Sequence, residues 1–296
     1  MYFCDMFVPN NTVKACLDYI KSRLNQQFSA SEIRQIQRAI FFKMFQFNAA
    51  DLMTRGDYRL SESELLDVRD AVKRLLANEP LQYIIGYTEF CDLTIHCDKR
   101  ALIPRPETEE LVFNVLEKAD LNQANTKILD LCTGTGCIAL ALKHHKPDAE
   151  VWALDYSTEA IELAKSNADN LELSLEIIEG NALKLNSIDS IKAKKWHLII
   201  SNPPYIPIAE KSIMASNVLH FEPHLALFVN DSDPLVFYKE IARYALNHLE
   251  RNGLLAFELH ENFAQDTADF CTKLGFSHVE IFEDLQGKPR MLLARI

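Results

Sequence analysis

The sequence predicts an α/β protein in which a mostly parallel, seven-stranded sheet follows a small helical bundle and a β-hairpin. The first 55 residues contain no glycine, and their apolar residues recur at the spacing of helices. From Leu81 to Leu102 apolar and polar residues partly alternate, which is typical of a hairpin. Apolar runs and helical patterns then follow one another, as expected for repeated β-α units with helices on both faces of the sheet.

The helical bundle is expected between Thr12 and Asn78. Its first two apolar stripes are Val13, Leu17, Ile20 and Leu24, and then Ile33, Ile36, Ile40 and Met44. A further helix covers the apolar residues from Leu65 to Leu76. Ser61 or Ser63 suits its N-cap, and Pro80 lies beyond its end.

The sheet is expected to contain seven strands. They are Lys127 to Leu131, Val151 to Asp155, Leu175 to Ile178, His197 to Ser201, Leu254 to Glu258, His278 to Glu283 and Met291 to Ile296. The last two are joined around Gly287 and should pair antiparallel. We therefore expect a helical N-terminal domain over residues 1–79, a hairpin linker over residues 80–104 and an α/β domain over residues 105–296.

Composition and charge exclude several classes of protein. Hydrophobic residues make up 48% and charged residues 25%, which excludes a disordered chain, and no apolar run approaches the roughly 18 residues of a membrane span. The net charge of −11 argues against a stable nucleic-acid partner. The seven cysteines are scattered without paired spacing, and residues 1–11 lack the pattern of a secretory signal. A cytoplasmic protein that does not bind membranes is expected.

A glycine-containing loop follows the first strand of the predicted sheet. "KILDLCTGTGCIALAL" places Asp130 at the end of an apolar strand, then Gly134 and Gly136, then a helix from Ile138. Ligands of open α/β sheets bind outside the carboxyl ends of the strands, where glycine lets the backbone approach them. Ala139 stands where a dinucleotide fingerprint has its third glycine. A turn without a ligand is the alternative for this stretch alone.

The second strand, "EVWALD", ends in Asp155, 19 residues after Gly136. An acid at this place can accept hydrogen bonds from both ribose hydroxyls of an adenosine-containing cofactor. The alternative is that Asp155 only caps the helix that starts near Ser157. Loop and acid together indicate an adenosine ligand, either NAD or S-adenosylmethionine.

The tetrapeptide Asn202-Pro203-Pro204-Tyr205 follows the buried strand "HLIIS" and should emerge beside the cofactor loop. The two prolines make a stiff segment whose carbonyls can point into a cleft. The Asn202 side chain and one such carbonyl present two acceptors to a planar NH₂ group, and Tyr205 can stack on its plane. The alternative is a rigid turn that only ends the strand.

This arrangement suits methyl transfer to a planar nitrogen. The lone pair of an amide or aromatic amine is delocalised, so the nitrogen is a poor nucleophile. Accepting both of its protons orients it toward an electrophilic methyl group and stabilises the positive charge that builds on it. The first step then requires no titrating base.

The sequence resembles the protein-(glutamine-N5) methyltransferases that modify bacterial peptide chain release factors, a family of class I S-adenosylmethionine-dependent methyltransferases. The resemblance rests on "LQYIIGYTEFCDL", "LIPRPETEELV", "ILDLCTGTGCIALAL", "IISNPPYI" and "FEPHLAL", which span the chain from about Pro80 onward. It implies a Rossmann-like catalytic domain after the hairpin linker and a substrate-recognition role for the helical domain. It also implies that the substrate is the glutamine of a Gly-Gly-Gln loop.

The resemblance assigns roles to individual residues. The catalytic residues would be Asn202, Pro203, Pro204 and Tyr205, with the Asn202 side chain and the Pro203 carbonyl accepting from the substrate NH₂ group. The cofactor would be bound by Asp130, Cys132, Thr133, Gly134, Thr135, Gly136, Asp155, Asn181, Ala182 and Asn202. Phe90, Arg105, Glu107 and Glu222 would belong to the substrate pocket.

Four residues depart from the family pattern. The family commonly has Gly at Cys132, Asp at Asn181, a bulky residue at Ala182 and Arg at His220. Cys132 requires an unstrained φ at its turn, and the Asn181 carbonyl can still bond an adenine amino group. Ala182 leaves the adenine less covered, and His220 is expected to alter only the loop before "FEP".

Three other functions compete with this one. A ribosomal-protein glutamine methyltransferase has similar motifs, and an N6-adenine nucleic-acid methyltransferase uses the same tetrapeptide for an exocyclic amine. A cofactor-binding module without catalysis is suggested by Asn181 and Ala182.

We expect no metal site, because His144-His145 suit the end of a helix and "ELHE" lacks zinc-site spacing. The Phe-rich stretch Phe41 to Phe47 is interpreted as bundle core, and any exposed part of it as a docking patch for a protein substrate.

Overall fold

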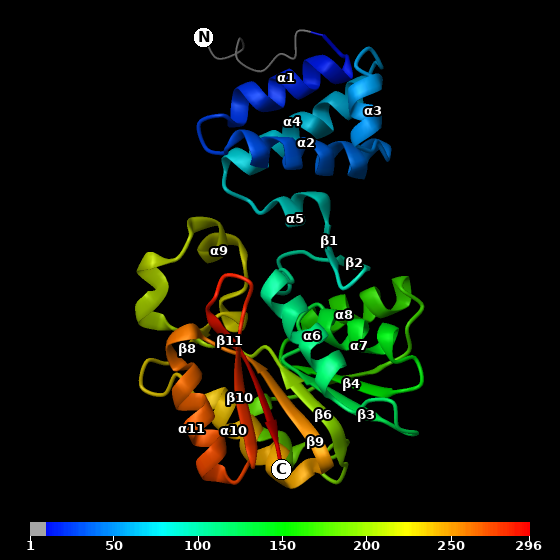
Figure 1. Cartoon of the computed structure of the whole chain (residues 1–296). Coiled ribbons are helices and arrows are strands. Elements are labelled where there is room, and N and C mark those ends of the chain that lie inside the picture. Colours follow the sequence, from blue (N-terminus) through cyan, green and yellow to red (C-terminus); the bar gives the residue numbers. More distant parts are fainter. Residues whose placement is uncertain (1–9) are drawn as a thin grey trace. The chain divides into compact units, whose positions relative to one another are not determined.

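The computed structural model describes residues 10–296. Cys4 and the start of the predicted first domain lie outside these residues. The chain divides into two compact units (Figure 1): one contains the chain up to Gly86 with Ser216–Phe221, and the other contains Tyr87–Ala215 and Glu222–Ile296. The N-terminal part of the first unit ends at Gly86, and the predicted domain boundaries at residues 79 and 104 stay predictions.

The first unit is helical, and the ends of its helices follow from local capping. Its helices are α1 (Val13–Leu24), α2 (Ala30–Phe45), α3 (Ala49–Thr54), α4 (Glu62–Leu76), α5 (Leu81–Ile85) and, from the later segment, α9 (Ser216–Phe221). Ser29 and Ser61 form capping boxes with Glu32 and Glu64. Ser61 is therefore the cap of α4, one of the two residues that the sequence offered.

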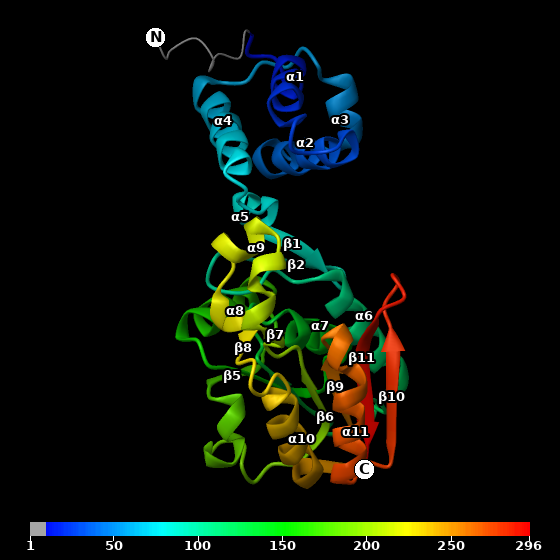
Figure 2. The ribbon, with the colours of Figure 1, turned by 90° about the vertical axis from the view of Figure 1, so that its left-hand side faces the viewer.

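The predicted apolar stripes form the core of this unit, whose helices α1, α2 and α4 are blue to cyan in Figure 2. Buried side chains from α1, α2 and α4 pack together, among them Ile20, Ile40 and Val72. Of the Phe-rich stretch, Phe41 and Phe47 are buried, whereas Phe42 is 44% exposed. The stretch is therefore mainly core, as predicted, with one phenylalanine at the surface.

The second unit contains the predicted hairpin, but it is shorter than expected, because Leu81–Ile85 form the helix α5 instead of a strand. Strands β1 (Tyr87–Phe90) and β2 (Leu93–His96) pair antiparallel. The two residues between them, Cys91 and Asp92, have φ of 47° and 64°, which is the geometry of a type I′ turn. The Asn167 side chain bonds both backbone groups of His96 and the Thr135 carbonyl, and so ties the hairpin to the glycine loop.

The seven-stranded sheet is confirmed. Its strands are β3 (Lys127–Leu131), β4 (Glu150–Asp155), β5 (Glu176–Glu179), β6 (Trp196–Ser201), β9 (Leu249–Glu258), β10 (His278–Glu283) and β11 (Pro289–Arg295). Their order is β10-β11-β9-β6-β3-β4-β5. The pairs between β9 and β5 are parallel, and β11 runs antiparallel to both of its neighbours, as expected for the last two strands.

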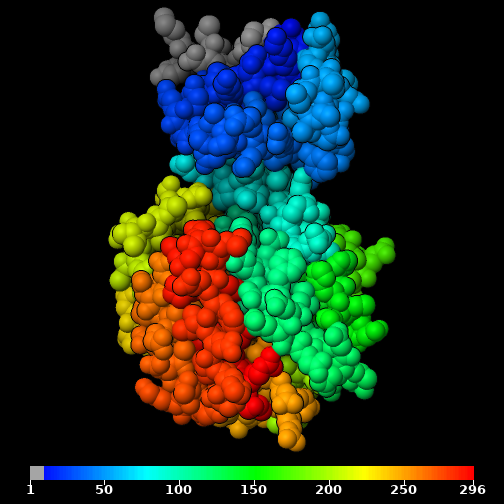
Figure 3. Space-filling model, in the orientation of Figure 1, coloured from blue at the N-terminus to red at the C-terminus, as the bar shows by residue number. Residues whose placement is uncertain are grey.

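Helices cover both faces of this sheet. One face packs against α6 (Pro106–Lys118), α7 (Cys137–His145) and α8 (Thr158–Asn170), and the other against α10 (Val236–His248) and α11 (Ala264–Leu274). Each face has its own core: the first core lies under α6, α7 and α8, and the second under α10 and α11. Neighbouring residues of one strand point to opposite faces, so Ile128 lies in the first core and Leu129 in the second. Figure 3 shows the β10–β11 hairpin at the surface beside α6, where Glu110 accepts a hydrogen bond from the Leu285 backbone N–H at 3.1 Å.

Short elements complete the unit. They are the 3₁₀ helices η1 (Ala182–Ser187), η2 (Ile208–Ile213), η3 (His224–Ala226) and η4 (Glu261–Phe263), and the two-residue strands β7 (Ile206–Pro207) and β8 (Phe228–Val229).

In the sheet, β4 and β5 follow β3 on one side, while β6 and β9 lie on its other side. The strand order therefore reverses between β3 and β6, and ligands bind at the carboxyl ends of strands at such a switch point. No helix in residues 10–296 is both long and apolar enough to cross a bilayer.

Candidate active site

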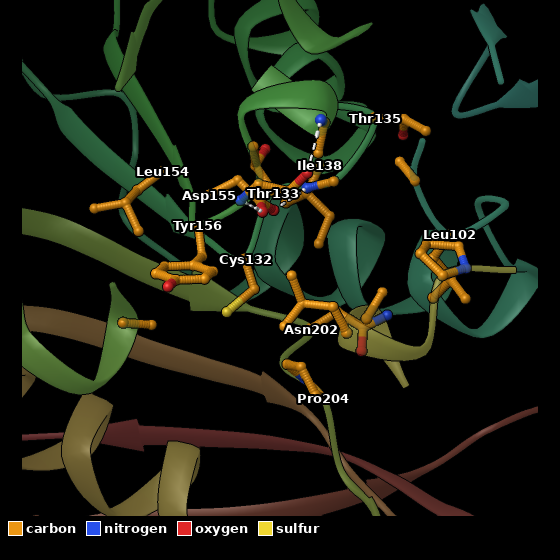
Figure 4. Close-up of a pocket in the computed structure, with 18 of the residues that line it drawn as sticks. Leu102, Cys132, Thr133, Thr135, Ile138, Leu154, Asp155, Tyr156, Asn202 and Pro204 are labelled. Carbon is orange, nitrogen blue, oxygen red and sulfur yellow. Dashed lines mark hydrogen bonds between the residues drawn. The ribbon is translucent and has the colours of Figure 1, made fainter. Parts of the chain in front are cut away.

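A cavity lies at the carboxyl ends of β3, β4 and β6. Figure 4 shows Cys132, Asp155 and Asn202 around one space, with Tyr156 and Leu102 at its borders. Each of the three follows or ends a different strand of the sheet. The cavity therefore brings together the loop, the acid and the tetrapeptide that the sequence placed at one edge.

The glycine loop differs from expectation at its first residue. Cys132 has a φ of +62°, in the left-handed region that favours glycine, so the expected unstrained φ is wrong. The Cys132 side chain borders the cavity and packs against the buried residues of the second core. This packing and the hydrogen-bonded turn after Cys132 hold a non-glycine residue in a strained conformation.

The two loop glycines have different tasks. The Gly134 N–H donates to Asp155 Oδ2 at 2.8 Å, and Gly134 borders the cavity with Thr133 and Thr135. Gly136 does not line it. A Cβ at Gly136 would lie 3.2 Å from both the Ala164 Cβ and the Leu140 Cδ1, and its φ is +83°. Gly136 is therefore required for the turn and for helix packing.

Asp155 faces the cavity and also holds the turns beside it. Besides the Gly134 bond, its Oδ1 accepts from the Ser157 N–H at 2.9 Å. The N-cap of α8 is Ser157, whose hydroxyl accepts from the Ala160 N–H, so the reading of Asp155 as that cap is wrong. Burial raises the pKa of Asp155. The two oxygens have about four lone-pair positions, of which the backbone N–H groups take some and the remainder is open to a ligand hydroxyl.

Asp130 lies beneath the loop, away from the cavity surface. Its side chain is fully buried, and its Oδ2 accepts from the Thr133 hydroxyl at 2.5 Å. Burial raises the pKa of Asp130 from 3.8 to about 7. Asp130 therefore supports the shape of the loop rather than presenting an oxygen to a ligand.

The four residues of the tetrapeptide diverge in the structure. Both prolines are buried, and of the four residues Asn202 and Pro204 border the cavity. The Tyr205 hydroxyl donates to Glu258 Oε1 at 3.0 Å, and its ring lies edge-on to the His260 ring. Neither Pro203 nor Tyr205 is among the described residues that border the cavity.

Glu258 is a residue that the sequence reasoning assigned no role. It ends β9, and its side chain is only 2% exposed. Burial raises the pKa of Glu258. The signal was available, because an acid closes the apolar run "LLAFE" in the same way that Asp130 and Asp155 close theirs.

Arg105 and Glu222 form an ion pair of 2.5 Å. Glu222 Oε2 also accepts from the Ile103 N–H at 3.2 Å. Arg105 borders the cavity, but Phe90, Glu107 and Glu222 are not among the described residues that line it. Phe90 is 1% exposed within the first core of the sheet unit. Of the four residues predicted for a substrate pocket, only Arg105 therefore faces this cavity.

The part of the cavity around Ala182, at the start of η1, is mainly apolar. Leu154, Leu183 and Phe237 border it together with Ala182, which is 4% exposed. Asn181 also borders it, and its side-chain oxygen accepts from the Leu183 N–H at 2.8 Å and caps η1. The aromatic rings of Tyr156 and Phe237 supply surface that the small Ala182 does not. The sequence patterns did not indicate these rings.

Gly180 is a further residue that sequence reasoning missed. A Cβ there would lie 2.8 Å from the Leu154 Cδ1 and 2.6 Å from the Ile188 Cδ1. The backbone after β5 therefore has to pass close to β4, and this passage places Asn181 and Ala182 at the cavity.

His220 lies in α9, within the helical unit, and its ring nitrogen Nδ1 bonds the Ser216 carbonyl at 2.6 Å. The structure gives it no place among the described residues around the cavity.

Comparison with protein families identifies both parts of the chain. Residues 15–86 match the family model described as the PrmC N-terminal domain, and residues 108–221 match the one described as the methyltransferase small domain. A solved methyltransferase from Pyrococcus furiosus is 18% identical, with a TM-score of 0.50 over 76% of this chain and 97% of that one. That likeness concerns the fold alone.

Curated relatives cover nearly the whole chain. The release factor glutamine methyltransferase of Flavobacterium psychrophilum is 37% identical, over 90% of this chain and 92% of the relative. The protein of the same name from Bacteroides thetaiotaomicron is 36% identical, over 93% of this chain and 97% of the relative. The resemblance seen in the motifs is thereby confirmed, and the chain belongs to the release factor glutamine methyltransferase family.

Proposed function

We propose that this protein transfers a methyl group from S-adenosylmethionine to the side-chain N5 of the glutamine in the Gly-Gly-Gln loop of a bacterial peptide chain release factor. The observation that carries the proposal is the shared cavity of Asn202, the glycine loop and Asp155. Membership of the family supports the reaction and the class of substrate.

The cavity has the chemistry that S-adenosylmethionine requires. Asp155 offers carboxylate oxygens to ribose hydroxyls, and the apolar end with Leu154, Leu183 and Phe237 suits an adenine ring. The backbone of the glycine loop allows a close approach at Gly134, where a Cβ would be 3.9 Å from its nearest neighbour, the Ala101 Cβ. When bound, S-adenosylmethionine supplies an electrophilic methyl group on a sulfonium sulfur.

Asn202 would orient the methyl acceptor. Its side-chain oxygen would accept one N–H of the glutamine amide, and the Pro203 carbonyl would accept the other. Pro203 is not among the described residues that border the cavity, so this second acceptor rests on the family resemblance alone. Two fixed acceptors place the nitrogen in line with the methyl group and favour the positive charge that develops on it. Tyr205 would act indirectly, since its hydroxyl is held by Glu258.

The helical domain, residues 1–79, would recognise the protein substrate, the hairpin over residues 80–104 would link it to the catalytic domain, and residues 105–296 would carry out the transfer. Exposed apolar side chains of the helical unit, among them Phe42, Met53 and Leu66, suit contact with another protein. The predicted cytoplasmic location and the predicted lack of a nucleic-acid partner stay predictions.

The experiment is to incubate the protein with S-adenosylmethionine and a bacterial release factor, and to map any added methyl group by mass spectrometry. The expected product carries one methyl group on the glutamine of the Gly-Gly-Gln peptide. A release factor with that glutamine changed to asparagine is the control and should stay unmodified.

Parallel reactions test the rivals. Ribosomal proteins, DNA and RNA are offered under the same conditions, with cofactor binding measured by calorimetry. Methylation of one of these substrates instead of the release factor would overturn the proposal. Tight cofactor binding without turnover on the release factor or on any of these other substrates would also overturn the proposal. The protein would then be a cofactor-binding module without catalysis.

A further inference from the structure

The Asn202 side chain is held by a chain of two hydrogen bonds that reaches into the protein core. Asn202 Nδ2 donates to Thr108 Oγ1 at 3.2 Å, and Thr108 Oγ1 donates to Glu258 Oε2 at 2.5 Å. The three residues come from the loop after β6, from α6 and from the end of β9. The fold therefore brings three distant segments together behind one amide.

The direction of these bonds follows from the chemistry of the groups. A threonine hydroxyl has one hydrogen and two lone pairs, and a carboxylate only accepts. The Thr108 hydrogen is therefore given to Glu258, and the hydroxyl oxygen accepts from the Asn202 NH₂ group. Of the Asn202 amide, this bond engages the nitrogen and leaves the carbonyl oxygen for a ligand, and both Asn202 and Thr108 border the cavity.

Burial keeps this arrangement free of competition from solvent. Thr108 and Glu258 are each 2% exposed. The second oxygen of Glu258 accepts from the Tyr205 hydroxyl, so both carboxyl oxygens are held by hydroxyl donors. With its acceptors engaged in this way, Glu258 fixes the orientation of Thr108, and Thr108 in turn fixes the orientation of Asn202.

We propose that Thr108 and Glu258 are positioning residues that lock the Asn202 amide with its oxygen toward the methyl acceptor. The inference rests on the proposed role of Asn202 and extends it to specificity. A locked oxygen accepts from an NH₂ group and repels a carboxylate, so the site selects a glutamine amide over a glutamate at the same position.

Thr108→Val tests the lock, because valine keeps the shape of threonine but offers no acceptor to Asn202. We expect kcat for glutamine methylation to fall on the order of tenfold to a hundredfold, as for a misplaced orienting group. The KM for S-adenosylmethionine should stay unchanged, and Thr108→Ser should restore most of kcat. Thr126→Val is the matched control, since Thr126 is also buried but precedes β3 at the opposite edge of the sheet.

A double-mutant cycle separates positioning from a general loss of structure. In an Asn202→Ala background there is no amide to orient, so adding Thr108→Val should change kcat by less than twofold. Equal losses in both backgrounds would overturn the proposal. A Thr108→Val variant that keeps full kcat beside an active wild type would overturn it as well.

A readout that does not depend on turnover is the ¹H–¹⁵N signal of the Asn202 side-chain NH₂ group, assigned by its disappearance in Asn202→Ala. In the wild type one of its two protons should exchange slowly with solvent, and Thr108→Val should abolish that protection. Equal exchange in both proteins would overturn the positioning role. A wild type that leaves the release factor unmodified would instead overturn the proposed function, and the exchange measurement then decides the positioning role by itself.

Discussion

Arg105 and Glu222 lie 117 positions apart in the sequence, and their side chains form an ion pair of 2.5 Å. Glu222 is almost fully buried, with 1% of its side chain exposed, while 34% of the Arg105 side chain is exposed. Residues on both sides of this pair border the cavity, namely Leu102 to Arg105 and Pro223 with Leu225 and Ala226. The pair therefore joins two walls of the site.

Breaking this pair should destabilise the sheet unit. Arg105→Met leaves the buried Glu222 carboxylate without its partner, and we expect a loss of about 1 to 3 kcal/mol, less than for a fully buried pair because Arg105 is partly in solvent. Urea unfolding followed by tryptophan fluorescence measures it, since both tryptophans, Trp152 and Trp196, lie in this sheet. Arg100→Met is the control, because its partner Asp98 has 45% of its side chain exposed, and this pair should contribute less than about 1 kcal/mol. Equal losses would contradict this account.

Asp155→Asn should weaken cofactor binding. The asparagine side chain has one acceptor oxygen in place of two. It therefore cannot accept hydrogen bonds from the Gly134 and Ser157 N–H groups and also from the ribose hydroxyls of the cofactor. We expect the Kd for S-adenosylmethionine to rise about tenfold or more, the effect of losing a charge-assisted hydrogen bond. Calorimetry measures it, with Asp169→Asn as control, because Asp169 is exposed on α8. An unchanged Kd would remove Asp155 from the cofactor site.

Cys132 should tolerate glycine and reject a β-branched residue. Its φ of +62° costs valine about 1 to 2 kcal/mol, whereas glycine adopts it without strain. Cys132→Val is therefore expected to lower the midpoint of thermal unfolding, and Cys132→Gly to leave it equal or higher. If both variants were equally stable, the left-handed conformation at this residue would be in question.

Asp130 should make the stability of the sheet unit depend on pH. Because the folded pKa of Asp130 is about 7 and its ordinary value is 3.8, the fold favours the protonated form. Its contribution is present at low pH and is lost as pH rises toward 7 and above. Relative to Asp130→Asn, the wild type should lose roughly 2.5 kcal/mol between pH 5 and pH 8. Urea unfolding of both proteins at the two pH values measures it, and a pH-independent difference would contradict the shift.

Much of the fold was predictable because its signals are local. The apolar runs from Lys127 onward indicate strands, the break around Gly287 indicates the antiparallel pair, and Ser61 indicates a helix cap. The same holds for Asp155 and Asn202, since each directly follows or ends a buried strand. Parallel strands that end at one edge bring such residues together whatever the details of packing.

The remaining features depend on contacts between distant segments. Glu258 and Thr108 meet across 150 positions, and no periodicity links them. Phe90 was assigned to the site but is buried in the core, because the hairpin packs its apolar side against α6 and α7. The left-handed φ of Cys132 was missed for a related reason: the backbone of a loop is set by its tertiary hydrogen bonds, and a cysteine gives no sign of them.

The most direct test of the account is a single-turnover measurement of methyl transfer to the release factor glutamine, comparing wild type with Asn202→Ala. Calorimetry on the same preparations measures S-adenosylmethionine binding. We predict a rate on the order of 10²-fold lower in the variant at S-adenosylmethionine concentrations that saturate both proteins, because the amide orients the acceptor. A variant that transfers the methyl group at the wild-type rate would contradict the central claim that the Asn202 amide holds the glutamine for methylation.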